Sequence, residues 1–189
     1  ISGVDVQKFN PSSEIRNLYR KQLNFQNNDV VFAFLGRMNT DKGILDLAKA
    51  FQKLHADFSN VKLLLIGFDE ENMQEKIREM HTENIIYFGP TPKPHEVLQA
   101  ADVFCLPSYR EGISRVLMEA ASMEKPIIAT NVTGCREVIN DGETGFLCKV
   151  KSPVDLAHKM AKIINMKEKK KVVMGQKGRV KVIEEMDLE

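Results

Sequence analysis

Short apolar runs alternate along this chain with longer stretches whose apolar residues recur at helical spacing. The runs are rich in β-branched and aromatic residues, the last one being weaker than the others: Val30–Leu35, Val61–Ile66, Ile85–Phe88, Val103–Leu106, Pro126–Ala129 and Gly145–Cys148. In the stretches between them, apolar side chains lie three or four residues apart, the spacing of a helix that buries one face. Such an alternation of strand and helix favours right-handed βαβ units around a parallel sheet.

The strand-like runs are almost wholly apolar, as expected when helices cover both faces of a sheet. The 189 residues can bury the core of one domain and are too few for two ordinary domains. We therefore expect a single α/β domain over residues 1–189, a Rossmann-like parallel sheet with helices on both faces. The expected helices cover residues 14–23, 45–54, 73–80, 97–101, 116–121, 153–166 and 168–185.

Charge and cysteine content exclude several classes of protein. The 27 basic and 26 acidic side chains are balanced, so nucleic acid is not expected as the main partner. Cys105, Cys135 and Cys148 form no CxxC pair, which indicates neither a zinc site nor a disulfide framework. The chain starts at Ile1 without a signal peptide or a membrane span, and we expect it to be part of a longer protein.

These features predict a cytoplasmic protein and leave open a place at the inner face of the membrane. The run Lys167–Lys171 is basic and could contact acidic lipid, although a solvated helix face is the commoner explanation.

The expected topology brings two polar loops together. In the common strand order 3-2-1-4-5, the first and fourth strands flank the switch point, where ligands bind at the carboxyl ends of the strands. Residues 36–43 follow the first strand and residues 107–112 follow the fourth. We therefore expect these two loops to face one another across a single crevice.

The first loop carries two cations that suit a diphosphate. Gly36 permits a sharp turn at the end of the strand, and Arg37 offers a planar fork of donors to phosphate oxygens. Lys42 adds a mobile charge just before the next helix, which Asp41 could cap. Together the cations could stabilise charge on a departing diphosphate. A surface Arg and Lys beside a turn is an equally simple explanation, and the loop matches neither a Walker A motif nor GxGxxG.

The second loop leads into a helix that two carboxylates bracket. Ser114 can cap this helix, which leaves the amides of Arg115 and Val116 available to an anion. Glu119 lies about 7.5 Å further along the axis, within an apolar face where a charge needs a reason. Because a carboxylate repels phosphate, we expect Glu119 to meet a ribose diol and Glu111 a sugar hydroxyl, with Gly112 allowing close backbone approach. Solvated charges are the alternative.

Several ordered motifs resemble the family 4 retaining glycosyltransferases of the GT-B fold. The pair Glu111 and Glu119, with seven residues between them, resembles the signature of that group. The first loop, with Gly36-Arg37 and Lys42-Gly43, resembles its other motif, and Ser2–Pro11 is similar to the segment that joins the two domains of the family. Further likeness lies in residues 126–130, 134–137 and 141–147, and the sequence is most similar to the polysaccharide, O-antigen and capsule branch.

The resemblance implies that this chain is the C-terminal donor-binding domain, with residues 1–11 as an interdomain segment and the N-terminal acceptor domain absent. It implies a nucleotide-sugar donor, usually a UDP-sugar, and no metal or other cofactor. Arg37, Lys42 and Glu111 would be catalytic. The substrate-binding residues would be Gly36, Arg37, Lys42, Pro90, Thr91, Ser108, Glu111, Gly112, Ile113, Ser114, Arg115, Val116 and Glu119.

Within that set, Arg37 and Lys42 would bind the diphosphate, Glu119 the ribose and Glu111 the transferred sugar. The base would lie against Pro90 and Thr91 and near Ser108. The family commonly has Gly-Phe-Gly after its first Glu, whereas this chain has Gly112-Ile113-Ser114-Arg115, which leaves the identity of the donor open.

The expected function is donor binding in an enzyme that moves a hexose or N-acetylhexosamine onto a glycan or lipid-linked acceptor during cell-surface polysaccharide synthesis. The chain alone is expected to transfer little, and the full-length protein could associate peripherally with a membrane. The alternatives are a non-catalytic nucleotide-binding module and a sugar-nucleotide epimerase of the same fold.

Overall fold

A six-stranded parallel sheet forms the centre of the computed structural model, which describes residues 3–186. The strands lie in the order β3-β2-β1-β4-β5-β6, and every neighbouring pair is parallel. Ile1 and Ser2 of the expected interdomain segment lie outside the described residues. The strands are β1 (Val30–Leu35), β2 (Val61–Ile66), β3 (Ile85–Gly89), β4 (Val103–Leu106), β5 (Ile127–Thr130) and β6 (Gly145–Cys148).

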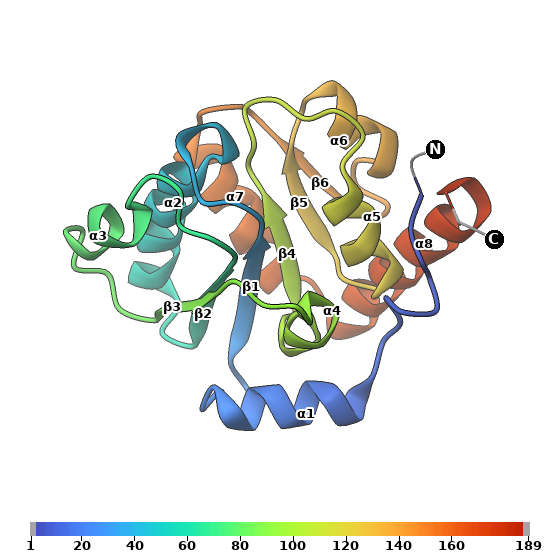
Figure 1. The fold of residues 1–189 in the computed structure, drawn as a ribbon, viewed down its shortest axis with the longest axis horizontal. Coiled ribbons are helices and arrows are strands. Elements are labelled where there is room, and N and C mark those ends of the chain that lie inside the picture. The colour runs from blue at the N-terminus through green and yellow to red at the C-terminus, as the bar shows by residue number, and fades with distance from the viewer. Residues whose placement is uncertain (1–2, 187–189) are drawn as a thin grey trace.

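Helices cover both faces of this sheet (Figure 1). Helix α2 packs beside α7 on one face, and α5 packs beside α8 on the other, while α1 lies against α4 and η2. The α-helices are α1 (Ser13–Gln22), α2 (Ile44–Asp57), α3 (Met73–Arg78), α4 (Pro94–Val97), α5 (Arg115–Ser122), α6 (Thr133–Val138), α7 (Pro153–Ile164) and α8 (Glu168–Met186). Two short 3-10 helices are η1 (Thr40–Lys42) and η2 (Leu98–Ala100).

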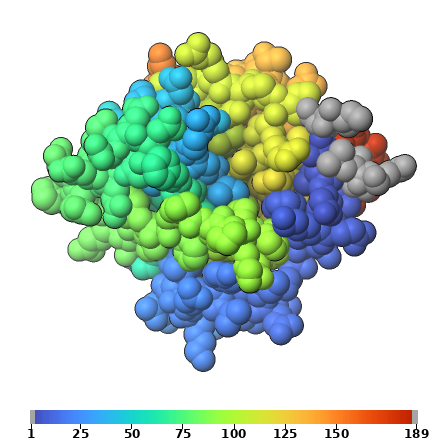
Figure 2. All heavy atoms as spheres, in the orientation of Figure 1, coloured from blue at the N-terminus to red at the C-terminus, as the bar shows by residue number. Residues whose placement is uncertain are grey.

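The core lies between the sheet and these two helical layers. Every residue of β4 and β5 is buried, whereas β3 at the edge is only half-buried along its length. Cys105, Cys135 and Cys148 are buried free thiols. Figure 2 shows the blue leading residues beside the green region around α4, in agreement with the contacts between α1 and α4. Between residues 3 and 186, no helix is long and apolar enough to cross a membrane.

The predicted α/β architecture is confirmed, and the predicted order 3-2-1-4-5 extends by one strand, β6, at its end. The expected helix over residues 97–101 starts earlier, at Pro94, and is split into α4 and η2. Helix α6 was not predicted. Its six residues are too few to display a helical period, and Thr133 and Gly134 are poor helix formers.

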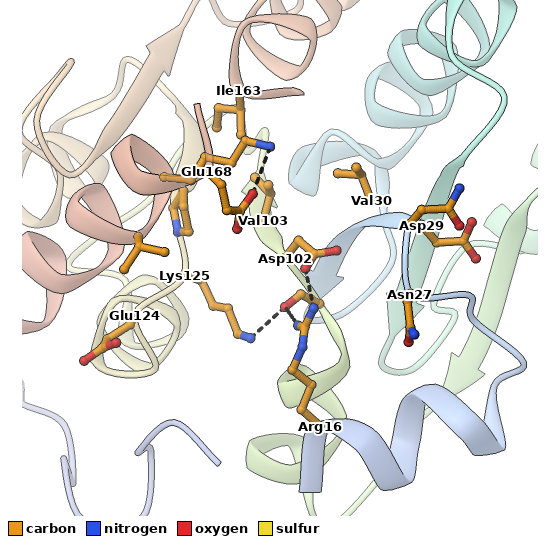
Figure 3. A pocket seen from close by; sticks show the side chains of 15 residues that line it. Arg16, Asn27, Asp29, Val30, Asp102, Val103, Glu124, Lys125, Ile163 and Glu168 are labelled. Carbon is orange, nitrogen blue, oxygen red and sulfur yellow. Dashed lines mark hydrogen bonds and ion pairs between the residues drawn. The ribbon is translucent and has the colours of Figure 1, made fainter. Parts of the chain in front are cut away.

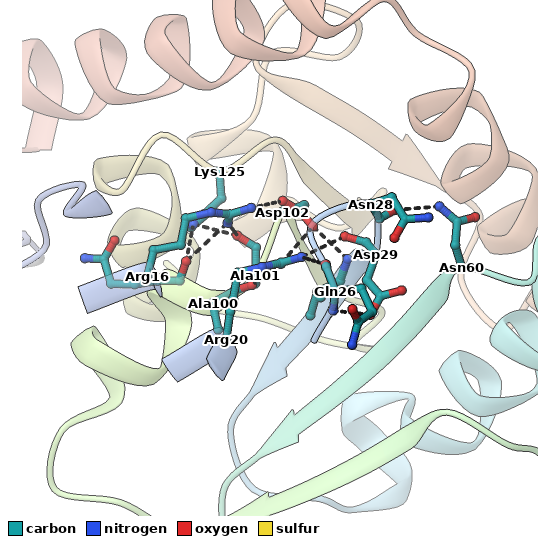
Figure 4. A network of polar contacts seen from close by, with 12 residues as sticks. Arg16, Arg20, Gln26, Asn28, Asp29, Asn60, Ala100, Ala101, Asp102 and Lys125 are labelled. Carbon is teal, nitrogen blue, oxygen red and sulfur yellow. Dashed lines mark hydrogen bonds and ion pairs between the residues drawn. The ribbon is translucent and has the colours of Figure 1, made fainter. Parts of the chain in front are cut away.

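A buried polar network ties α1 to the amino ends of the strands (Figure 4). The Arg20 guanidinium donates to the carbonyl oxygens of Ala100 at 2.8 Å and Asp29 at 3.0 Å. The Lys125 ammonium donates to the carbonyl of Ala101 at 2.6 Å, and burial lowers its pKa to about 7. A hollow of about 520 Å³ lies beside this network (Figure 3). The Asp102 carboxylate pairs with Arg16 at 2.6 Å and with Arg20 at 3.4 Å, and the remaining donors meet backbone carbonyls, so we assign the network a structural role.

Candidate functional site

The loops that follow β1 and β4 meet above the carboxyl edge of the sheet, at the top of Figure 1. The Tyr109 amide donates to the carbonyl of Asp41 at 2.8 Å and joins the two loops directly. Gly43 has a φ of 73°, and a Cβ at this position would collide with the carbonyl oxygen of Pro107. Only glycine therefore allows the first loop to lie so close to the second, and the expected single crevice is confirmed.

A local turn aims Lys42 at the second loop. The side chain of Asn39 accepts a hydrogen bond from the Lys42 amide at 2.9 Å and caps η1. The prediction that Asp41 caps the next helix is wrong, because Gly43 is the N-cap of α2 and no side chain caps that helix. The Asp41 carboxylate instead lies 3.5 Å from the guanidinium of Arg110.

Glu111 is anchored from both loops. Its Oε1 lies 2.6 Å from the Lys42 ammonium and accepts a hydrogen bond from the Ser108 hydroxyl at 2.7 Å. The Glu111 side chain is only 11% exposed, so it is not a solvated charge. These two partners satisfy the buried carboxylate and fix its position at the mouth of the crevice.

The start of α5 offers free amides to the crevice. The Ser114 hydroxyl accepts a hydrogen bond from the Leu117 amide at 3.3 Å, which confirms the predicted cap. The amides of Arg115 and Val116 come before the first turn closes, so they have no acceptor inside the helix. This geometry suits an anionic ligand.

Within the protein's own packing, two backbone segments approach one another closely at Gly134, and the predicted close approach of a ligand at Gly112 stays a prediction. A Cβ on Gly134 would collide with the carbonyl oxygen of Gly112, whereas a Cβ on Gly112 would meet no protein atom within 4 Å. Helix α6 therefore packs closely against the second loop through Gly134, whose role the sequence did not reveal.

A cavity of about 340 Å³ opens between the loops and the start of α5. It brings together eight of the predicted site residues, together with Leu35 and Leu106 at the strand ends. Ser108 and Gly112 belong to the same loop but do not line this cavity, and neither do Pro90, Thr91 and Glu119. The eight predicted residues that line it are Gly36, Arg37, Lys42, Glu111, Ile113, Ser114, Arg115 and Val116.

The predicted site residues differ in how firmly they are held. The Arg37 side chain is 69% exposed, and its nearest acidic neighbour is Glu70 at 3.8 Å. Ser108 is buried, and its carbonyl accepts a hydrogen bond from the Thr130 hydroxyl. Arg37 is therefore available to a ligand, whereas the buried Ser108 positions Glu111 through the hydrogen bond that its hydroxyl donates.

Glu119 is half-buried in the second turn of α5, and no basic side chain among residues 3–186 lies within ion-pair distance of it. Burial raises the pKa of its carboxyl to about 7, while the positive charges of Arg115 and Lys8 act in the opposite direction. Sequence reasoning missed Lys8, since only the tertiary fold carries the leading segment to α5. Glu119 is thus a carboxyl that gains from a hydrogen-bond donor supplied by a ligand.

Pro90 and Thr91 lie at the carboxyl end of β3, the edge strand next to β2. The Thr91 hydroxyl accepts a hydrogen bond from the Lys93 amide at 3.1 Å, which shapes this turn. Their predicted contact with a base, like the other ligand roles, stays a prediction. In the part of the chain that the structure describes, no three His, Cys, Asp or Glu side chains group together as metal ligands would.

Residues 15–181 match the model of a protein family described as glycosyl transferases group 1. The chain belongs to this family. It is 32% identical to the capsular polysaccharide biosynthesis glycosyltransferase CapM of Staphylococcus aureus, over 96% of this chain and 48% of CapM. It is 28% identical to the putative glycosyltransferase EpsD of Bacillus subtilis, over 94% of this chain and 47% of EpsD. This group 1 chain thus spans about half the length of these curated relatives.

Solved structures confirm the fold of this group 1 domain. The complex of Anabaena HepE with UDP superposes with a TM-score of 0.88 at 22% identity, over 98% of this chain and 52% of HepE. The C-terminal domain of the group 1 protein LpcC from Francisella tularensis gives a TM-score of 0.88 at 21% identity, over 99% of this chain and 100% of that domain. The predicted Rossmann-like half of a GT-B fold is therefore confirmed.

Proposed function

We propose that this chain binds the nucleotide-sugar donor, a UDP-sugar, of a retaining glycosyltransferase. The observation that carries the proposal is the contact of Lys42 with Glu111 across the start of α5. The two side chains and the start of α5, with its free amides, line the same cavity. These are the groups needed for a ligand that is anionic at one end and rich in hydroxyls at the other.

The diphosphate would lie between Arg37, Lys42 and the amides of Arg115 and Val116. Arg37 is exposed and free to close over a phosphate, while Lys42 already points into the cavity. As the bond to the sugar breaks, negative charge grows on the diphosphate, and these groups would stabilise it. This arrangement would need no metal ion, which is part of the proposal.

The carboxylates would hold the neutral parts of the donor. Glu111 would accept a hydrogen bond from a hydroxyl of the transferred hexose or N-acetylhexosamine, and Glu119 would accept from the ribose. The choice of UDP is supported by the similarity to HepE, which was crystallised with UDP, and a role in surface polysaccharide synthesis by the name of CapM. Retention at the anomeric carbon rests on the resemblance described above.

The acceptor, a glycan or a lipid-linked sugar, would bind to the remaining half of the full-length protein. The relatives' greater length supports a second domain that completes the cleft. We expect that protein to be cytoplasmic, with peripheral association at the membrane, and the present chain alone to transfer little sugar.

Calorimetry with UDP, GDP, ADP and their sugar conjugates tests donor binding. We expect UDP compounds to bind, with strong losses in Arg37→Ala and Glu119→Ala and none in the remote control Lys76→Ala. Folded protein that binds no nucleoside diphosphate would contradict the proposal. A full-length protein that binds UDP-sugar but neither transfers nor hydrolyses it would be a non-catalytic module, and conversion of UDP-GlcNAc to its 2-epimer would identify an epimerase.

A further inference from the structure

Four lysines from α7, α8 and the residues that join these helices line one hollow. Lys159 and Lys162 come from α7, Lys167 precedes α8, and Lys170 lies in the first turn of α8. The hollow has a volume of about 650 Å³, and His158 lies at its wall. The basic run of the sequence is therefore part of a larger surface to which the preceding helix contributes.

No acidic residue is among those that line the hollow, within the described part of the chain. The nearest acidic residue in sequence, Glu168, lies 3.7 Å from the Lys171 ammonium and lines the separate hollow of Figure 3. Since the whole chain has a formal net charge of only +1, this gathering of positive charge is a local asymmetry. Such a patch attracts a surface of opposite charge.

The basic surface continues along α8 next to exposed aliphatic side chains. Lys170, Val173, Lys177 and Val180 follow one another at spacings of three and four residues, so they share a face of the helix. All four are exposed, and Val173, Lys177 and Val180 also border a separate hollow whose lining includes Glu143, Glu184 and Glu185. Lysines beside valines on one exposed helical face present both positive charge and a small aliphatic surface to a bilayer interface.

We propose that this lysine surface, made of Lys159, Lys162, Lys167, Lys170, Val173 and Lys177, docks onto an anionic lipid bilayer. The lysine ammonium groups would contact lipid phosphates, and Val173 would enter the boundary between headgroups and acyl chains. The proposal rests on the membrane association proposed above and names the surface that achieves it. A nucleic acid would use the charges but would have no use for the adjacent valines, which a bilayer interface can bury.

The position of the surface is compatible with donor binding. Helix α7 follows the carboxyl end of β6 and runs back along the sheet, so its last turn approaches the amino edge. The donor cavity lies at the carboxyl edge. A bilayer on the lysine surface would therefore leave the cavity open to solvent.

Cosedimentation with vesicles tests the proposal on the 189-residue chain, because the comparable LpcC domain was crystallised by itself. We expect binding to vesicles of equal parts phosphatidylglycerol and phosphatidylcholine, weakened as salt rises from about 0.1 to 0.5 M. The triple variant Lys162→Gln, Lys167→Gln and Lys170→Gln should lose about 100-fold in partitioning, at about fivefold for each lysine. Val173→Ser should lose a smaller factor.

The matched control variant replaces three exposed lysines elsewhere and should retain most of the vesicle binding. Its substitutions are Lys21→Gln, Lys49→Gln and Lys76→Gln. Absence of binding by the wild type at low salt, equal binding to pure phosphatidylcholine, or equal loss in both triple variants would each overturn the proposal. Retention on heparin without vesicle binding would overturn it in favour of another polyanion. UDP calorimetry on the same variants separates this outcome from failure of the donor site.

Discussion

Binding of a UDP-sugar is expected to tighten about tenfold between pH 6 and pH 8, because Glu119 would hold the ribose hydroxyls as a carboxylate, which is a stronger hydrogen-bond acceptor than the protonated carboxyl group. Burial raises the pKa of this carboxyl to about 7. A group with that pKa is ionised in roughly one tenth of the molecules at pH 6 and in roughly nine tenths at pH 8. If only the ionised form binds the ribose, affinity follows this ninefold to tenfold change.

The assay is calorimetry with an intact UDP-sugar rather than UDP. The terminal phosphate of UDP has its own ionisation near pH 6, whereas the esterified diphosphate of a UDP-sugar does not, so the sugar conjugate isolates the protein group. Glu119→Gln is the matched variant, since it keeps the shape and cannot titrate. It should bind more weakly at pH 8 and show little change with pH.

Two results would refute this reasoning. Wild-type affinity that stays constant from pH 6 to pH 8 would mean that Glu119 does not hold the ribose as a carboxylate. A pH dependence of equal size in Glu119→Gln would assign the titration to another group. If wild-type affinity changed by much more than tenfold between pH 6 and pH 8 while that of Glu119→Gln did not, a second proton would be coupled to donor binding.

Three further predictions concern stability. Between pH 4.5 and 7 the folded Glu119 retains a proton that the unfolded chain has lost, so the free energy of unfolding of the wild type should fall as pH rises. The expected fall is about 1–2 kcal/mol after allowance for the partial exposure of this side chain. Urea unfolding at several pH values should show this slope in the wild type and a flatter one in Glu119→Gln. Gly134→Ala should lower the free energy of unfolding by about 2 kcal/mol or more, whereas Gly112→Ala should leave the Tm nearly unchanged. Lys42→Ala should lower the free energy of unfolding by about 1–3 kcal/mol, because it leaves the Glu111 carboxylate with Ser108 as its remaining partner. A double-mutant cycle with Glu111→Ala measures the coupling, and a coupling energy of zero would contradict this prediction.

The sheet was predictable because nearly all of its strands are buried on both faces. Runs such as Val61–Ile66 contain almost no polar residue, so their limits in the structure agree closely with the apolar pattern. The expected strand order by itself placed the loop of Lys42 opposite that of Glu111, because parallel strands bring their following loops to one edge.

What escaped prediction depends on contacts between distant segments or on short local choices. Asn39, Thr40 and Asp41 are all good capping residues, and only the η1 turn selects Asn39. The influence of Lys8 on Glu119 arises only when the leading segment reaches α5. The collision that requires glycine at position 134 likewise involves a carbonyl more than twenty residues away in sequence.

The ion pair between Lys42 and Glu111 has a consequence for the end of the reaction cycle. The Glu111 carboxylate pairs with the same ammonium group that a diphosphate would use, so it would compete with the nucleotide from within the protein. A spent nucleoside diphosphate has lost the sugar that would engage Glu111, and the carboxylate is then free to take Lys42 back. The same contact that arranges the cleft for a fresh donor would thus hasten the departure of the used one.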